Sequence, residues 1–109
     1  MAEDVLVVLS TFGSPEHARQ VATALVEERL AACANLLPGV ESIYRWRMGV
    51  ETAKETMVLF KLSEDRYYAF EARLRELHTY EVPEIISLRV QHGHFPYLQW
   101  VDESCRPPW

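Results

Sequence analysis

Residues 5–9 read Val-Leu-Val-Val-Leu, and this uninterrupted apolar run constrains the fold more than any other part of the sequence. A short run rich in β-branched residues predicts a strand covered on both faces. Neither it nor any other apolar run approaches the roughly 20 residues that span a bilayer. After a short loop over residues 10–13, Ser14 is a suitable N-cap and Pro15 a suitable first helical residue. Apolar residues then recur at intervals of three and four as far as Leu30, which predicts an amphipathic helix.

The middle of the chain predicts a long hairpin. Residues 32–47 are rich in strand-forming residues with a break at Pro38-Gly39, and we expect Cys33 on a central strand. Residues 50–62 return as a second long strand, after a turn in which Gly49 takes the left-handed position. Arms of this length can extend beyond the core, and exposed strand edges invite pairing with another chain.

The second half predicts, in order, a helix over residues 63–78, a loop over 79–84, a strand over 85–90 and a helix over 96–103. Ser63 is the N-cap of the first of these helices, and Pro83 excludes a helix from the loop. The resulting order, βαββαβ followed by a helix, is the ferredoxin-like plan. We therefore expect an α+β fold with a long central hairpin and an extra C-terminal helix, in a single domain over residues 1–109.

Composition and short motifs narrow the function. The formal net charge is −5, from 11 Lys and Arg against 16 Asp and Glu, and the basic residues are not clustered, so nucleic-acid binding is not expected. Cys33 and Cys105 lack the spacing of a disulfide framework or a zinc site and fit reduced thiols. The acidic start at residues 1–4 does not resemble a signal peptide, so we expect a cytoplasmic protein without membrane contact. Phosphate-loop, dinucleotide-binding and serine-hydrolase motifs are absent from the sequence, so we do not expect an enzyme.

His78, Glu81 and Glu84 form the first candidate site. Imidazole and carboxylate groups both bind divalent first-row metals, and a tight loop containing proline can bring two of these side chains together. The alternative is that His78 caps a helix C-terminus and that both glutamates are solvated. Cys33 is a second candidate ligand, for copper(I) or another soft metal, whereas a buried free cysteine is more often a small apolar residue. A metal is not expected to be required for the fold.

Two further sets of side chains have an open interpretation. His92 and His94 either chelate a metal or only mark a turn. Aromatic and charged residues that could line a pocket form the other set: Tyr44, Arg45, Trp46, Lys61 and Tyr80. Residues of these types line ligand pockets, but they also pack in cores and subunit interfaces.

Four segments of the chain together resemble one known family. They are residues 30–35 (Leu-Ala-Ala-Cys-Ala-Asn) with the following Pro38-Gly39, residues 42–46 (Ser-Ile-Tyr-Arg-Trp), residues 78–84 (His-Thr-Tyr-Glu-Val-Pro-Glu) and residues 97–100 (Tyr-Leu-Gln-Trp). In sequence and in order they are similar to segments of the CutA divalent-cation-tolerance proteins. The resemblance covers nearly the whole chain, from Val5 to Val101.

The resemblance implies a ferredoxin-like fold, a tight homotrimer assembled through sheet edges and long hairpins, and a link to tolerance of copper and other divalent metals. It implies no established enzymatic activity. The candidate metal ligands on matching positions are Cys33, His78, Glu81 and Glu84. The PII signalling proteins have a similar architecture and bind small ligands between subunits, so the resemblance also implies an inter-subunit cleft. Its expected lining residues are Tyr44, Arg45, Trp46, Lys61 and Tyr80.

The chain departs from the family pattern at several positions. Thr79 replaces a usual proline, which leaves the His78 loop less fixed, and Gly49 lies one place later than usual, which alters the hairpin turn. Ala34 and Leu62 replace a usual valine and threonine.

The sequence leaves other functions open. A PII-like sensor of a small anionic metabolite would use Arg45, Lys61 and His78 as donors, by analogy of fold alone. A scaffold without a ligand site would use its hairpins as the functional surface. An acylphosphatase-like anion loop at residues 10–14 is disfavoured, because it has one glycine and no adjacent arginine.

Overall fold

The computed structural model of the chain describes residues 4–107, so most of the acidic start lies outside the described residues. The elements are β1 (Val5–Phe12), α1 (Pro15–Glu27), β2 (Cys33–Trp46), β3 (Gly49–Ser63), the 3-10 helix η1 (Glu64–Arg66), α2 (Tyr67–Leu77), β4 (Ile86–Arg89) and α3 (Phe95–Ser104). This order confirms the predicted α+β, ferredoxin-like fold with a long hairpin and an extra C-terminal helix. The helices of residues 4–107 are all too short or too polar to cross a membrane.

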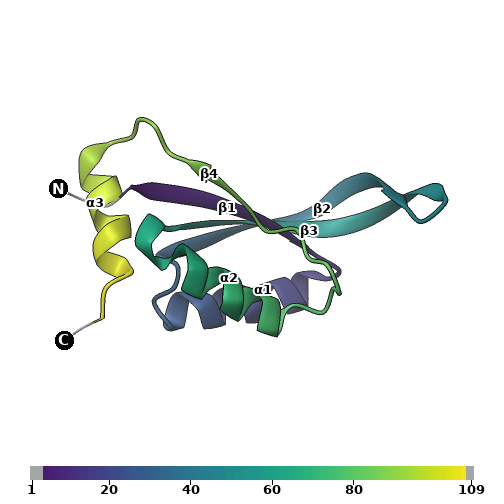
Figure 1. The fold of residues 1–109 in the computed structure, drawn as a ribbon, viewed down its shortest axis with the longest axis horizontal. Helices are drawn as coiled ribbons and strands as arrows, with labels where there is room; N and C mark the ends of the chain where they lie inside the picture. The colour runs from purple at the N-terminus through teal and green to yellow at the C-terminus, as the bar shows by residue number, and fades with distance from the viewer. Residues whose placement is uncertain (1–3, 108–109) are drawn as a thin grey trace.

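The strands form one antiparallel sheet in the order β2-β3-β1-β4. Helices α1 and α2 lie together under one face of the sheet, and α3 crosses its end beside both chain termini (Figure 1). The outer part of the β2–β3 hairpin projects away from the helices, which makes the molecule 48 Å long but only 27 Å and 22 Å across.

The core lies between the sheet and the two helices. Alternate side chains of β1 and β3 face the helices, because successive residues of a strand point to opposite faces. The largest fully buried apolar side chains are Phe12, Phe60, Phe70, Leu25, Leu62, Leu74, Val8, Val58 and Val101. Phe60 and Phe70 meet edge to face with ring centroids 5.0 Å apart, which joins the sheet to α2. Ser14 caps α1 by accepting the N–H of His17 at 3.1 Å, and Pro15 follows it as predicted.

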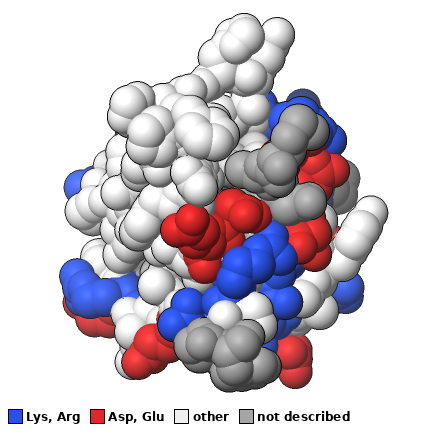
Figure 2. All heavy atoms as spheres, turned by 90° about the vertical axis from the view of Figure 1, so that its left-hand side faces the viewer, with Lys and Arg blue, Asp and Glu red and all other residues white. Residues whose placement is uncertain are grey.

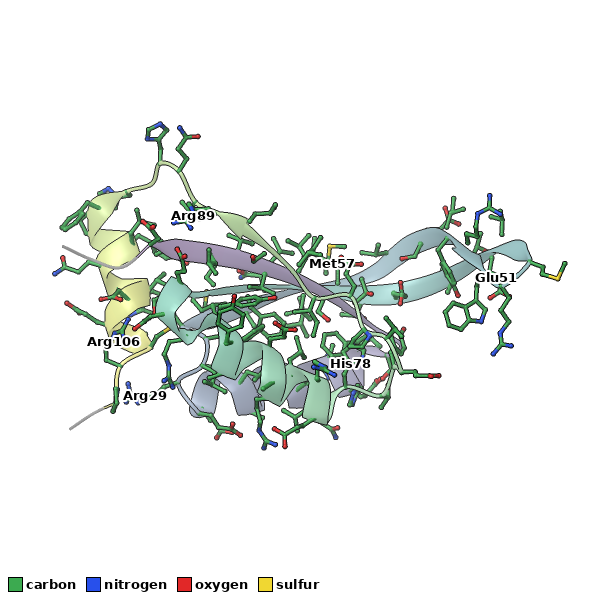
Figure 3. All side chains as sticks on the ribbon, in the orientation of Figure 1. Arg29, Glu51, Met57, His78, Arg89 and Arg106 are labelled. Atoms are coloured by element: carbon green, nitrogen blue, oxygen red, sulfur yellow. The ribbon has the colours of Figure 1, made fainter. Side chains whose placement is uncertain are left out.

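The opposite face of the sheet is apolar and only partly buried. In the described part of the chain no element covers it, and Met57 points away from the helices (Figures 1 and 3). The ladder register gives its apolar side chains as Val7, Leu9, Leu37, Met57, Leu59, Ile86 and Leu88, and it also places Thr11, Cys33, Asn35 and Lys61 on this face. Leu37, Ile86 and Leu88 are 45%, 52% and 58% exposed. We call this surface the open face.

Two predictions at element boundaries are wrong. Residues 10–12 continue β1 instead of forming a loop, because they pair with Val58, Met57 and Thr56 of β3. Ser63 does not cap α2: its hydroxyl donates to Asp65 Oδ1 at 2.9 Å, and the short η1 separates it from that helix.

The expectation that Cys33 lies on a central strand is also wrong, because β2 is an edge strand. The predicted break at Pro38-Gly39 is a bulge, in which these two residues stand opposite one residue of β3. Gly39 adopts φ +78°, a left-handed conformation that glycine tolerates. Pro38 cannot donate a hydrogen bond, which an edge strand accommodates.

The hairpin turn differs from the prediction. Trp46 pairs with Gly49, so Arg47 and Met48 form a two-residue loop. The left-handed residue is Arg47, with φ +55°, and not Gly49. With glycine at position 49, the left-handed position of the turn is occupied by an arginine, although residues with a Cβ rarely adopt this backbone conformation.

Candidate functional site

His78 follows α2 and turns its ring into the protein, so that only 8% of the residue is exposed. The ring stacks on Phe12, with 4.4 Å between centroids and 15° between planes. His17 of α1 meets it edge-on, with centroids 6.1 Å apart. Figure 3 shows His78 beneath the sheet at the end of α2. His78 is thus both the predicted helix C-cap and a packed interior residue.

Backbone groups use both ring nitrogens of His78. Nε2 lies 2.8 Å from the Thr11 carbonyl oxygen, and the Tyr80 N–H donates to Nδ1 at 3.1 Å. A carbonyl only accepts and an N–H only donates, so this network assigns a neutral ring with its proton on Nε2. Burial lowers the pKa of His78, and the neighbouring His17 lowers it further, while the bond to Thr11 opposes both. A metal ion would have to displace one of these two bonds to reach the ring.

Tyr80 links the loop to the hairpin. Its hydroxyl donates to Glu55 Oε2 at 2.7 Å, and its ring lies 4.7 Å from that of His78. It also covers Gly13, where an added Cβ would stand 3.6 Å from the hydroxyl oxygen. Burial and the bond to Glu55 raise the pKa of Tyr80, so the phenol keeps its proton and continues to donate. Tyr80 thereby fixes the position of one oxygen of Glu55.

Glu55 and Glu84 are the acidic part of the site. Partial burial raises the pKa of Glu84, and the negative charge of Glu55 raises it further. A cation that approaches Glu84 would offset the unfavourable effect of the Glu55 charge on it. Carboxylate oxygens are ligands that divalent cations accept. This carboxylate pair is an alternative to the predicted combination of His78 with Glu81, since the His78 ring nitrogens already have backbone partners.

The predicted ligands do not gather in one place within a chain. Thr11, which contacts His78, pairs with Met57, whereas Cys33 pairs with Lys61 on the far side of β3. Four residues along a strand and two strand spacings separate the two positions by roughly 16 Å. Between residues 4 and 107, no three His, Cys, Asp or Glu side chains are grouped so that they could hold a metal ion. A shared site for Cys33 and His78 would therefore need groups from another chain.

The predicted cleft residues are spread along the hairpin. Tyr44 and Trp46 alternate with Arg45 and therefore share one face, and Tyr44 lies close enough to Tyr80 to raise its pKa. Arg45 pairs with Val50, eleven residues along β3 from Lys61, which corresponds to roughly 36 Å. The Lys61 ammonium donates to Asn35 Oδ1 at 2.6 Å. One chain therefore does not bring Arg45, Lys61 and His78 together as an anion site.

Sequence reasoning missed three residues that build this site: Thr11, Phe12 and Glu55. The sequence predicts a loop at Thr11 and Phe12, but these residues end the strand on which His78 packs. Glu55 stands in a run of alternating polar residues that resembles a solvated strand face, so its partner Tyr80, 25 positions away, gave no local signal.

The sequence of the chain is similar to those of known proteins. A family model described as CutA1 divalent ion tolerance protein matches residues 6–104. The chain belongs to the CutA1 family. The divalent-cation tolerance protein CutA of Thermus thermophilus is 46% identical over 98 residues, which cover 90% of this chain and 95% of the relative. Human protein CutA is 45% identical over 84 residues, covering 77% of this chain and 47% of the relative. The chain thus spans nearly all of the bacterial CutA but about half of the human one.

Solved CutA1 structures share the fold. The T. thermophilus protein superimposes with a TM-score of 0.89 at 45% identity, covering 92% of this chain and 97% of that one. CutA1 of Oryza sativa gives a TM-score of 0.93 at 34% identity, covering 96% of each chain. A sequence relative from the same plant is named Protein CutA 1, chloroplastic, and is 36% identical over 101 residues, 93% of this chain and 57% of the relative. The family and fold that the four segments implied are confirmed. The family model and the T. thermophilus protein are named for tolerance of divalent ions or cations.

Proposed function

We propose that this protein acts as a homotrimer in divalent-cation tolerance and binds or responds to metal ions such as copper. The observation that carries the proposal is its membership of the CutA1 family, whose model and T. thermophilus member are named for divalent-ion tolerance. The proposed role involves no catalysis. The predicted cytoplasmic location is part of the proposal, although the rice relative is named as chloroplastic.

The open face and the sheet edges support assembly. The open face displays aliphatic side chains, among them Leu37, Ile86 and Leu88, that a monomer would leave in contact with water. Strands β2 and β4 are the two edges of the sheet, so their outer backbone groups are available to another chain. The outer hairpin adds Ile43, Trp46 and Val50, which are 67%, 47% and 66% exposed. A second and third copy would remove these surfaces from water.

The position of the carboxylates supports a metal site between chains. Glu55 and Glu84 lie where the loop meets the outer hairpin, and Tyr80 orients Glu55. Among residues 4–107 of one chain, they lack the third ligand that a metal site usually requires. We propose that a neighbouring subunit supplies the remaining donors, and that Cys33 and Glu81 contribute to metal binding in the assembled protein.

Sedimentation equilibrium tests the assembly. The chain has a mass of 12.7 kDa, and we expect a particle of three times this mass across micromolar concentrations. A monomer at the same concentrations would refute the proposed trimer. Replacing Leu88 by Glu on the open face should dissociate the trimer, whereas Tyr68→Glu on exposed α2 should leave the mass unchanged.

Calorimetric titration with copper(II), copper(I) and zinc tests the metal site. We expect binding tighter than millimolar in the wild type, weakened in Glu84→Gln and in Cys33→Ala. Glu103→Gln is the matched control, because it removes one negative charge from an exposed position on α3. Absence of binding, or equal weakening by Glu103→Gln and Glu84→Gln, would contradict a specific site.

A further inference from the structure

The C-terminal end of α3 is held by a group of ionic contacts that we call the Arg106 clasp. The Arg106 guanidinium donates from Nη2 to Asp65 Oδ1 at 2.7 Å, to Asp102 Oδ1 at 2.7 Å and to Ser63 Oγ at 3.0 Å. Nη1 adds a second bond to Asp65, at 2.5 Å. The clasp therefore joins α3 to the turn that follows β3.

A second arginine, Arg29, also contacts Arg106. Arg29 Nη1 donates to the backbone carbonyl of Arg106 at 3.0 Å, and Arg29 itself adopts φ +60° after α1. Figure 3 shows Arg29 and Arg106 at the lower end of α3, and Figure 2 shows basic and acidic side chains side by side on this end of the molecule. The Arg106 charge lowers the pKa of Asp65, so both partners are ionised at neutral pH.

Few apolar side chains fix α3. Val101 and the following Cys105 are fully buried, and Leu98 packs partly buried against the core. The aromatic residues Phe95, Tyr97 and Trp100 are 61%, 41% and 45% exposed. An element with few buried apolar contacts can open locally, and the clasp adds ionic contacts at its C-terminal end.

The other end of α3 reaches a residue of the proposed metal site. The Tyr97 hydroxyl lies 3.6 Å from Cys33 Sγ. Cys33 is partly buried and is the first residue of the edge strand β2. Burial and the contact with Cys33 raise the pKa of Tyr97 to about 12, so the hydroxyl stays protonated beside the thiol.

We propose that α3 is a strap that limits access to the Cys33 thiol, and that the Arg106 clasp holds this strap closed. Releasing Arg106 frees the C-terminal end of a short rigid helix, and Tyr97 then leaves Cys33 together with it. The proposal deepens the proposed function, since Cys33 is a candidate ligand there. It concerns only access to the thiol, so it can fail or hold independently of metal binding.

Thiol labelling with Ellman's reagent tests the strap, and it needs no metal. Cys105→Ala leaves Cys33 as the reporter of the Tyr97 end, and Cys33→Ala leaves Cys105 as the reporter of the clasp end. In each background we compare wild type, Arg106→Ala and Arg106→Lys. Arg73→Ala is the matched control: it cuts an arginine–glutamate pair between α2 and α1, and the Arg73 and Arg106 side chains are both 36% exposed.

We expect Arg106→Ala to speed labelling of both thiols together, by about fivefold or more, with Arg106→Lys in between and Arg73→Ala within about twofold of wild type. Raising the salt concentration should speed labelling of Cys33 in the wild type but not in Arg106→Ala, because salt screens the clasp. The salt comparison in the wild type holds even if Arg106→Ala fails to fold. Faster labelling of Cys105 alone, an equal effect of Arg73→Ala, or no change in Cys33 would each overturn the proposal.

Discussion

The inner and outer halves of the β2–β3 ladder share one backbone pairing pattern but have opposite surroundings. In the inner half, Val58 and Phe60 are fully buried between the sheet and the helices. In the outer half, Ile43, Val50 and Met48 are 67%, 66% and 100% exposed. Hydrogen bonds between two strands stabilise a ribbon only marginally in water, so the inner half owes its stability to side-chain burial. The outer half also carries large apolar side chains but leaves them exposed, which is why we assign its cover to other chains.

The largest effect is expected in the inner half. Phe60→Ala should destabilise the protein by about 3–5 kcal/mol, since it removes a fully buried ring that meets Phe70 edge to face. Urea denaturation followed by circular dichroism measures the change. A loss below about 1 kcal/mol would mean that the inner half does not depend on this core.

A smaller effect is expected where the inner half meets the 78–84 loop. His78→Ala should cost about 2 kcal/mol, because it removes the stack on Phe12 and leaves the Tyr80 N–H without its acceptor. Burial lowers the folded-state pKa of His78 below 6.5, so the unfolded chain binds the proton more readily. The stability that His78 contributes is therefore complete above pH 6.5 and is lost as the pH falls through its folded-state pKa. Denaturation midpoints between pH 7.5 and 5 should fall less steeply in His78→Ala, and equal slopes would contradict this origin.

The hairpin turn is expected to respond in the opposite direction. Arg47→Gly should stabilise the outer half by up to about 1 kcal/mol, because glycine adopts φ +55° without the penalty that arginine carries. Part of the gain is offset by loss of the Arg47 contact over the Trp46 ring, at 5.7 Å. Met48→Gly is the control, since Met48 is fully exposed and is not a positive-φ residue. In thermal melts, the melting temperature should rise for Arg47→Gly and not for Met48→Gly.

The smallest effect is expected on the outer hairpin surface. Ile43→Ala should change the stability of an isolated chain by less than about 0.5 kcal/mol, because the side chain is mostly exposed already. If other chains cover the outer half, the loss becomes larger and depends on protein concentration. Thermal melts of wild type and Ile43→Ala at two protein concentrations a hundredfold apart decide between these cases. A loss that stays small at both concentrations would show that other chains do not cover the outer half.

The fold was predictable because its signals are local. The apolar run at residues 5–9, the Ser14-Pro15 helix start and the Pro38-Gly39 break each depend on neighbours in sequence, and each lies where expected. The boundary errors occurred where distant pairing overrode local preference. Thr11 and Phe12 are strand residues because β3 pairs with them, which no turn preference reveals.

The site was less predictable because its geometry depends on contacts between distant residues. Glu55 and Tyr80 are 25 residues apart, and the Thr11 carbonyl and the His78 ring are 67 apart. The family resemblance singled out the segment 78–84 as a source of candidate metal ligands. It could not indicate that both nitrogens of His78 are used internally, because hydrogen-bond partners are not part of a sequence motif.

The bulge at Pro38-Gly39 acts as a phase shift along β2. Before it, odd-numbered residues of β2 stand opposite odd-numbered residues of β3, as Leu37 does with Met57; after it, even-numbered ones do, as Tyr44 does with Glu51. One inserted residue thus reverses which residues of β2, odd-numbered or even-numbered, lie on a given face of the sheet beyond the bulge. A strict alternation continued through residues 38 and 39 would therefore place Tyr44 and Trp46 on the wrong side of the sheet. The numbering of the faces along the whole arm is set by a single position, remote from these aromatic residues.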